Sequence, residues 1–120
     1  MTQKAISIRQ PWAHLIVSGH KPIENRSWST TYRGPLLIHA SLSTSELSQD
    51  IAGRYGVAID ANSLQFGGLI GVVELIDVIT HSSSPWFSGP FGWVLTAPRK
   101  IDFIPLRGRL GLFHVVGRNY

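Results

Sequence analysis

The 120-residue sequence contains no cysteine, which excludes disulfide bridges, thiolate metal sites and cysteine nucleophiles. Charged residues are also scarce, because Asp, Glu, Lys and Arg make up only 15% of the chain against 43% hydrophobic residues. This composition indicates one ordered domain with a single hydrophobic core, not a disordered chain. The lack of thiols suits a reducing compartment, so we expect a cytoplasmic protein.

Long apolar runs are missing as well. The most apolar stretch, residues 67–80, is interrupted by Glu74 and Asp77, so it lacks the uninterrupted length of a membrane-spanning helix. The first residues have neither the apolar segment nor the small-residue cleavage site of a signal peptide. We therefore expect no membrane association.

The secondary structure predicted from periodicity and turn residues is a mixture of strands and helices. Strands or extended segments are expected at residues 5–8, 22–28, 35–40, 68–80, 91–103 with a break at Pro98, and 109–117. Helices are expected at residues 11–19, between Pro11 and Gly19, and at 44–55, after a capping-box pattern of Ser43 and Glu46. Residues 57–67 and 82–90 are predicted loops, and the second is expected to carry two exposed aromatic residues, Trp86 and Phe87. Five or six strands with two helices predict a small α+β protein built on a mixed sheet or barrel.

One short segment concentrates the polar chemistry of the chain. Residues 19–26 read GHKPIENR, a Gly-x-Lys-x-x-Glu-x-Arg run that follows the first predicted helix, with Gln10-Pro11-Trp12 before it. Together with the strand at 71–77, Trp93 and the closing GRLGLF of residues 108–113, this pattern resembles the ASCH domain family, named from activating signal cointegrator homology.

The resemblance implies a single ASCH domain over residues 1–120, folded as a small PUA-like mixed β-barrel with two or more flanking helices and a cleft over the motif. Members of this superfamily are tied to RNA. Some ASCH proteins act as nucleic-acid binders, ribonucleases, or amidohydrolases that remove acetyl from acetylcytidine. The resemblance therefore implies an RNA or nucleotide-like ligand.

Three residues of the motif are candidates for chemistry. Lys21 suits a phosphate contact, a base or a nucleophile, or else a solvated lysine that caps the preceding helix. Glu24 and Arg26 lie two residues apart and share one side of an extended segment, either as an ion pair or as an acid/base group beside a phosphate-binding guanidinium. If the ion pair uses all the hydrogen-bonding atoms of Glu24 and Arg26, neither side chain is free to bind a ligand.

Aromatic and polar residues flank the motif. Trp28 and Tyr32 are expected to stack on bases, and Arg33 to lie on the rim of the cleft. Thr31 is a candidate ligand contact that supplies a hydroxyl. Trp12 is expected to pack on the apolar face of the first helix.

Two further residues are candidate catalytic groups. The acetylcytidine-cleaving ASCH proteins use a lysine, a threonine three residues later and a distant glutamate. Here Glu24 stands in place of that threonine, and Glu74 is a candidate for the distant glutamate. His39 is a candidate acid/base residue whose side chain points away from those of Leu36, Ile38 and Ala40.

Neither a metal nor a cofactor is expected. The five histidines lack the spacing of zinc motifs, and the sequence contains no Walker, Rossmann or nucleophile-elbow pattern.

Three functional interpretations remain open. The first is a module that binds RNA or a nucleotide-like ligand in a basic cleft, in line with a net charge of +4. The second is a hydrolase of the same cleft, either a nucleoside amidohydrolase or a ribonuclease, with Lys21 catalytic. The third is a protein-interaction module that uses Trp86 and Phe87 in the 82–90 loop. We place binding first and hydrolysis second.

Overall fold

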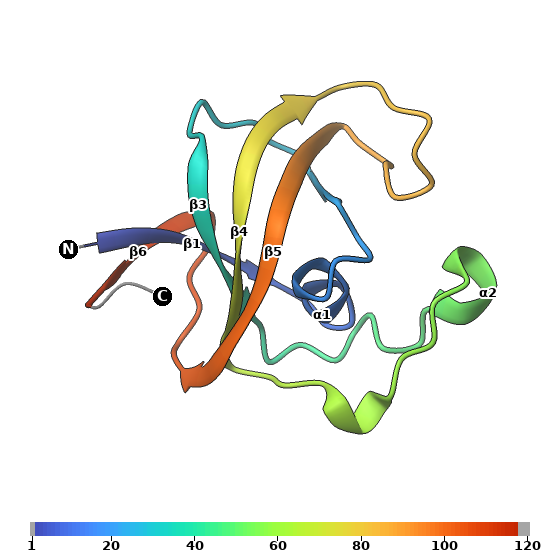
Figure 1. Cartoon of the computed structure of the whole chain (residues 1–120), viewed down its shortest axis with the longest axis horizontal. Helices are drawn as coiled ribbons and strands as arrows, with labels where there is room; N and C mark the ends of the chain where they lie inside the picture. The colour runs from blue at the N-terminus through green and yellow to red at the C-terminus, as the bar shows by residue number, and fades with distance from the viewer. Residues whose placement is uncertain (1, 118–120) are drawn as a thin grey trace.

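The computed structural model describes residues 2–117, which form six strands and two α-helices (Figure 1). In chain order the elements are β1 (Thr2–Ile8), α1 (Trp12–Val17), β2 (Ile23–Arg26), β3 (Gly34–Ala40), α2 (Ile51–Tyr55), a 3-10 turn (Ala61–Ser63), β4 (Gly68–Ile79), β5 (Phe91–Pro105) and β6 (Leu112–Val116).

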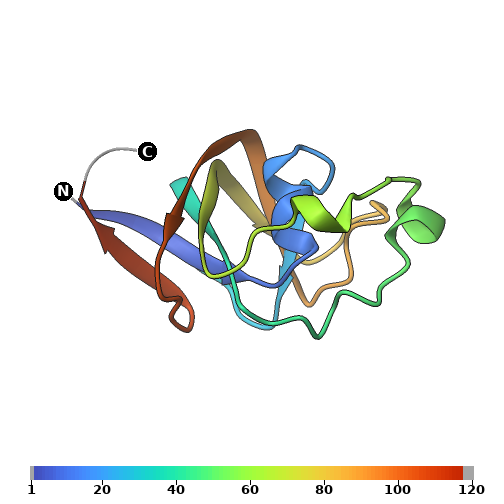
Figure 2. The same cartoon turned by 90° about the horizontal axis from the view of Figure 1, so that it is seen from below.

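All six strands belong to one curved mixed sheet in the order β2-β5-β4-β3-β1-β6. Only β1 and β3 run parallel, and every other neighbouring pair is antiparallel. The predicted small α+β fold with a mixed, barrel-like sheet is thereby confirmed, although β2 and β6 are free edges of the described sheet and do not close it. Figures 1 and 2 show α1 inside the curve of the sheet and α2 farther out, beside the loop between β4 and β5.

The hydrophobic core has one cluster on each face of the sheet, because strand residues alternate between faces. Leu36, Ile38 and Ala40 of β3 pack with α1 in the larger cluster. Leu37 packs with Phe113 of β6 in the smaller one. His39 contacts Phe113 edge to face, so its side chain lies on the face opposite Leu36, Ile38 and Ala40, as the alternation predicts.

Helix α1 packs closely on β4 because a glycine lies beneath it. A Cβ atom placed on Gly71 would come within 2.5 Å of Val17 and 2.7 Å of the carbonyl oxygen of Arg99. The helix ends where the sequence predicts, since Gly19 takes the left-handed conformation with φ of 87°. Below this turn the chain enters β2, so the packing of α1 sets the position of the motif residues.

The helix predicted at residues 44–55 is much shorter in the structure. Residues 45–48 form a turn, and Ser43 Oγ bonds Ser45 Oγ. Helix α2 begins only after Asp50, whose carboxylate accepts a hydrogen bond of 2.9 Å from Gly53 N. The physical reason is that the segment has little to bury, because Leu47 is 41% exposed and Ile51 is the buried residue of α2.

Two smaller expectations also need correction. Strand β5 continues through Pro98, since the chain bends at Ala97 with φ of 50° and the strand goes on to Pro105. Trp86 and Phe87 of the 82–90 loop, which were expected to be exposed, are half-buried. The helices within residues 2–117 are all too short to cross a membrane.

Candidate functional site

A groove of about 1450 Å³ runs past the first turn of α1 and the Gly-x-Lys-x-x-Glu-x-Arg segment. Its floor is formed by the end of β1, by Trp12, by Lys21 and by residues 24–28. One wall comes from α2 and the turns before it, and another from residues 85–88 of the β4–β5 loop. The segment 103–111 completes its far end.

Lys21 enters the groove from the turn that ends α1. The backbone N–H groups of His20 and Lys21 both donate to Leu15 O, at 2.9 and 3.0 Å, so the chain turns back under the helix. The side chain of Lys21 is only 5% exposed, which excludes the alternative of a solvated helix-capping lysine. Burial lowers the pKa of its amine, and the carboxylate of Glu24 acts in the opposite direction.

Lys21, Glu24 and Arg26 form one charge cluster. Glu24 Oε1 lies 3.7 Å from Lys21 Nζ, and Glu24 Oε2 lies 2.9 Å from Arg26 Nη2. Lys21 also donates to the carbonyl oxygen of Ile23. Glu24 and Arg26 thus lie on the same side of β2, as expected. The carboxylate of Glu24 bridges the two cations, Lys21 and Arg26.

One donor of Arg26 has no hydrogen-bond partner despite this pairing. Its Nη2 donates to Ser7 O at 2.9 Å, in addition to its contact with Glu24. Its Nε is the buried side-chain nitrogen that lacks a hydrogen-bond partner within residues 2–117. A buried guanidinium N–H without an acceptor costs free energy, so a ligand oxygen that reaches it gains a charge-assisted hydrogen bond.

Three aromatic rings are grouped next to Lys21. Tyr55 of α2 and Trp86 of the β4–β5 loop stack face to face, with centroids 3.9 Å apart and planes 10° apart. Trp12 meets Tyr55 edge to face at 6.2 Å. Lys21 Nζ lies 5.7 Å from the Trp12 ring centroid and 6.0 Å from that of Trp86, within the range of cation–π attraction.

Asn25 ties the β4–β5 loop to the motif. Its amide nitrogen donates to Trp86 O at 2.9 Å, and its amide oxygen accepts from the backbone N–H groups of Ser88 and Gly89 at 2.9 and 3.1 Å. Phe87 packs over Gly92, where a Cβ atom would come within 2.7 Å of its ring. The loop aromatics are therefore held in place by β2 and β5.

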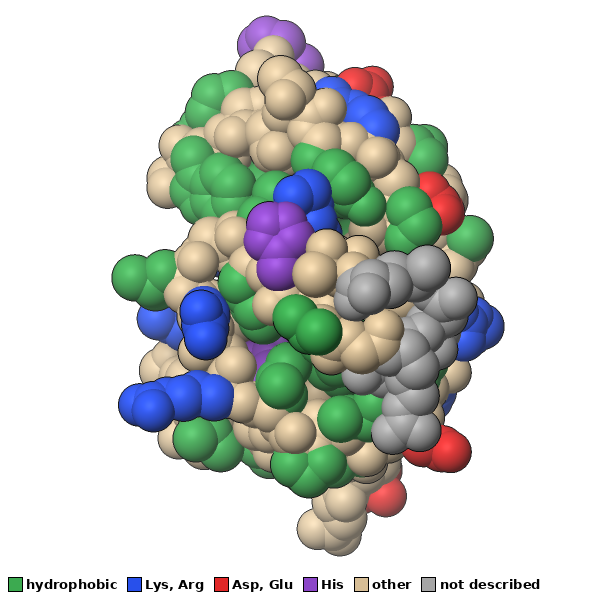
Figure 3. Space-filling model, turned by 90° about the vertical axis from the view of Figure 1, so that its left-hand side faces the viewer, with side chains coloured by type: hydrophobic (Ala, Val, Ile, Leu, Met, Phe, Trp, Pro, Cys, Tyr) green, Lys and Arg blue, Asp and Glu red, His purple; other side chains and the backbone are tan. Residues whose placement is uncertain are grey.

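The rim of the groove is rich in arginine. Six of the ten basic residues within residues 2–117 line the groove, against two of the seven acidic ones: Arg9, Lys21, Arg26, Arg54, Arg107 and Arg109, with Glu24 and Glu46. Arg9, Arg54, Arg107 and Arg109 are exposed. Viewed from the β1 and β6 side, basic side chains protrude from the left edge of the molecule, and others lie near its acidic side chains at the right and top (Figure 3).

Trp28 and His39 are predicted site residues that also line the groove. Trp28 packs edge to face on the buried Trp93, whose indole N–H donates to Trp28 O at 3.3 Å. His39 is buried, with Nδ1 2.9 Å from Ser7 Oγ and Nε2 2.6 Å from Leu106 O. Because a carbonyl oxygen only accepts, Nε2 carries a proton and donates to Leu106 O. Both ring nitrogens are thus engaged, one with β1 and the other with the segment that follows β5.

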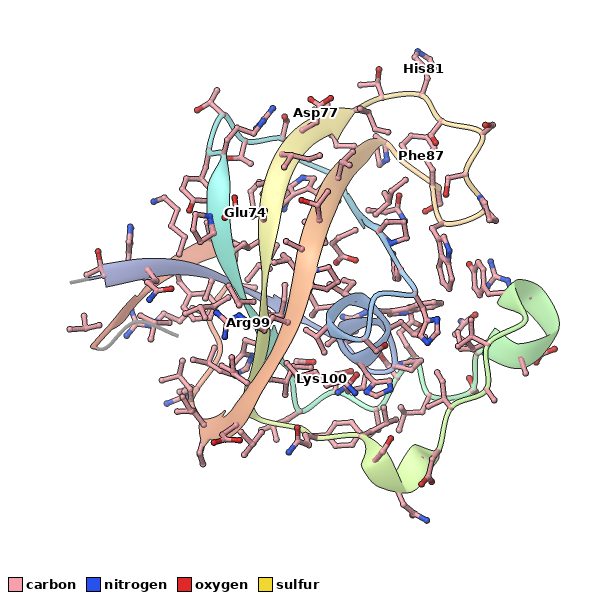
Figure 4. The ribbon with its side chains drawn as sticks, in the orientation of Figure 1. Glu74, Asp77, His81, Phe87, Arg99 and Lys100 are labelled. Atoms are coloured by element: carbon pink, nitrogen blue, oxygen red, sulfur yellow. The ribbon has the colours of Figure 1, made fainter. Side chains whose placement is uncertain are left out.

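Four predicted site residues lie outside this groove. Glu74 and Tyr32 line a second hollow of about 640 Å³ together with Lys4 and His114. Figure 4 shows Glu74 on the far side of β4 from Phe87. Thr31 is exposed, and Arg33 bonds Thr30 O and Tyr32 O and faces Asp77 at 3.8 Å. The structure therefore does not bring Glu74, Thr31, Tyr32 or Arg33 to the Lys21 cluster.

Sequence reasoning missed Tyr55 and assigned Trp12 to packing alone. Trp12 does pack against the core, but it also lines the groove. The sequence places Tyr55 on a long predicted helix and carries no signal that would pair it with Trp86. In the part of the chain that the structure describes, no three His, Asp or Glu residues lie close enough to hold a metal ion.

Comparison with known proteins identifies relatives of this chain. The profile of the ASCH domain family matches residues 6–104. Activating signal cointegrator 1 of Homo sapiens is 38% identical over 119 residues, covering 86% of this chain and 20% of the human protein. The Mus musculus protein of the same name is 38% identical over 83 residues, covering 63% of this chain and 14% of the mouse protein. The chain thus spans about a fifth of the length of these relatives or less.

Solved structures with the same fold come from an ASCH protein of Zymomonas mobilis. One of its point mutants superposes with a TM-score of 0.60 at 16% sequence identity, covering 94% of this chain and 89% of that chain. The ASCH structure without a stated mutation gives a TM-score of 0.58, also at 16% identity, with 94% and 87% covered.

Proposed function

This chain belongs to the ASCH domain family, and we propose that its arginine-lined groove binds single-stranded RNA or a nucleotide-like ligand. The observation that carries the proposal is the gathering of six basic residues and three aromatic rings around one groove. Arginine binds phosphate through paired N–H donors, and aromatic faces stack on bases.

Each part of the groove has a role in this proposal. The exposed arginines of the rim meet the phosphates, and Arg26 Nε donates to an oxygen of the ligand once the ligand has displaced the side chains that cover this nitrogen. Glu24 holds Lys21 and Arg26 in place and keeps the buried cations from repelling each other. Trp12 and Trp86 offer stacking surfaces next to them.

The contribution of the rim is tested by removing two of its charges. We expect an Arg107→Gln, Arg109→Gln double variant to bind a single-stranded RNA of about eight nucleotides more weakly than the wild type. If each arginine neutralises one phosphate, the slope of log K against log salt becomes shallower by about 1.4, at about 0.7 per phosphate. Fluorescence anisotropy titrations at several salt concentrations measure both changes.

A matched control removes the same net charge elsewhere. Arg33 and Lys100 are both exposed and lie outside the groove, so an Arg33→Gln, Lys100→Gln variant should retain the wild-type salt slope. If both double variants lose the same affinity and the same salt slope, RNA binding depends on net charge alone, and the proposal that the groove binds RNA is wrong.

The second candidate function is hydrolysis in the same groove, and the lowered pKa of Lys21 is the observation that favours it. A buried amine with a lowered pKa is more often neutral at physiological pH, which suits a base or nucleophile. In this case the wild type should release acetate from N4-acetylcytidine, and Lys21→Arg, which stays protonated, should not. Chromatography of the nucleoside decides the matter, since an unchanged substrate after long incubation with wild type rules this reaction out.

A further inference from the structure

We propose that Tyr55 occupies the place of one unpaired planar base, and that a base binds by displacing Tyr55 from the face of Trp86. The inference rests on the proposed function and deepens it, because it names the ligand unit that the aromatic part of the groove accepts. It also assigns opposite roles to two rings that look alike in the structure.

The position of Tyr55 is that of a stacked ligand. Its ring lies parallel to Trp86 at 3.9 Å and edge-on to Trp12 at 6.2 Å. Nucleobases stack on tryptophan in the same parallel manner, and the affinity of such contacts depends little on which base is present. The ring of Tyr55 therefore fills a slot whose fixed surfaces are those that a base would use.

The two stacked rings are held very differently. Trp86 is anchored through the three hydrogen bonds between Asn25 and its loop. Tyr55 ends a five-residue helix whose residues 52–54 are exposed, and its hydroxyl makes no hydrogen bond to any described residue. Displacing Tyr55 breaks mainly its ring contacts, whereas displacing Trp86 breaks the anchored loop.

The slot also has a polar end that suits the edge of a base. Lys21 Nζ lies within 6.0 Å of the Trp86 ring centroid, and Glu24 contacts this amine. An ammonium donor and a carboxylate acceptor side by side match the mixed donors and acceptors on a base edge. A slot that one tyrosine ring fills has room for one unpaired base and not for a base that is hydrogen-bonded to its complement.

The prediction is that the two aromatic truncations act in opposite directions. Tyr55→Ala should bind single-stranded RNA about two- to tenfold more tightly, because the ligand no longer competes with an aromatic pair. Trp86→Ala should bind it about tenfold more weakly or worse, because the stacking surface is lost. Tyr55→Phe keeps the ring and should match the wild type.

The experiment titrates the four proteins with fluorescein-labelled single-stranded RNA of about eight nucleotides and with the same RNA annealed to its complement, after thermal melts have verified folding. The gain of Tyr55→Ala should appear with the single strand and not with the duplex. Weaker binding by Tyr55→Ala, or an equal gain on duplex, overturns this inference while leaving the proposed function intact. If neither the wild type nor Tyr55→Ala binds RNA, both proposals fail.

Discussion

Glu24→Gln is expected to lower the free energy of unfolding by about 3 kcal/mol, because it removes the carboxylate that bridges Lys21 and Arg26. The substitution preserves shape and leaves one buried ammonium and one half-buried guanidinium without a counter-charge. Removing a single partner of a buried ion pair is far more costly than replacing the whole pair. Thermal and urea unfolding measure the loss, which corresponds to a fall in Tm of roughly 10 °C.

The same variant should show a characteristic pH dependence. Glu24 raises the pKa of Lys21 against the larger effect of burial, so its loss lowers the pKa of the folded amine further. In the pH range between the lowered pKa of folded Lys21 and the ordinary lysine pKa of about 10.4, the unfolded chain binds more protons than the folded chain. The free energy of unfolding therefore rises with pH in this range. The deficit of Glu24→Gln should therefore shrink as the solution is made alkaline.

Glu74→Gln provides the matched control for this substitution. Glu74 is half-buried and lies in the second hollow, away from the Lys21 cluster. We expect its replacement to change stability by about 0.5 kcal/mol or less. A Glu24→Gln protein as stable as Glu74→Gln across the pH range would show that the carboxylate does not hold the cluster together.

Arg26→Gln is expected to weaken the binding of single-stranded RNA by about 10- to 100-fold, the range for loss of one hydrogen bond from a charged donor. The reason is that Arg26 alone among the described residues offers a buried donor without a partner in the groove. Arg26→Lys should recover only part of the affinity, since an ammonium can pair with Glu24 but cannot present the Nε donor. Anisotropy titrations at fixed salt compare the three proteins, and an Arg26→Lys variant with wild-type affinity would reduce the role of Arg26 to charge alone.

The parts of the site that could be predicted are those encoded by short spacing. Lys21, Glu24 and Arg26 meet because a helix end and a period-two strand place them there, and both features are visible in the sequence. The resemblance to ASCH domains supplies the rest of the fold, including the mixed sheet. Family membership and fold class are therefore predictable from the amino-acid sequence alone.

The walls of the groove could not be predicted in this way, because they depend on contacts between residues that are far apart in the sequence. Tyr55 and Trp86 come together only through the docking of α2 beside the β4–β5 loop, for which no periodic pattern exists. Tyr32 and Arg33 follow the motif closely in sequence, but the chain between β2 and β3 carries them toward β4 and away from the groove. Register shifts in β4 likewise prevent its two carboxylates from being assigned to a face by counting alone.

The most direct test of a ligand site at the charge cluster is the NMR signal of the Arg26 Nε–H group during titration with short single-stranded RNA. An Arg26→Lys spectrum identifies the signal, and the Nε–H of Arg33 serves as an internal reference outside the groove. We predict that the Arg26 signal shifts downfield in proportion to bound RNA while that of Arg33 stays in place. An Arg26 signal that is unchanged at saturating RNA would contradict a ligand site at this cluster.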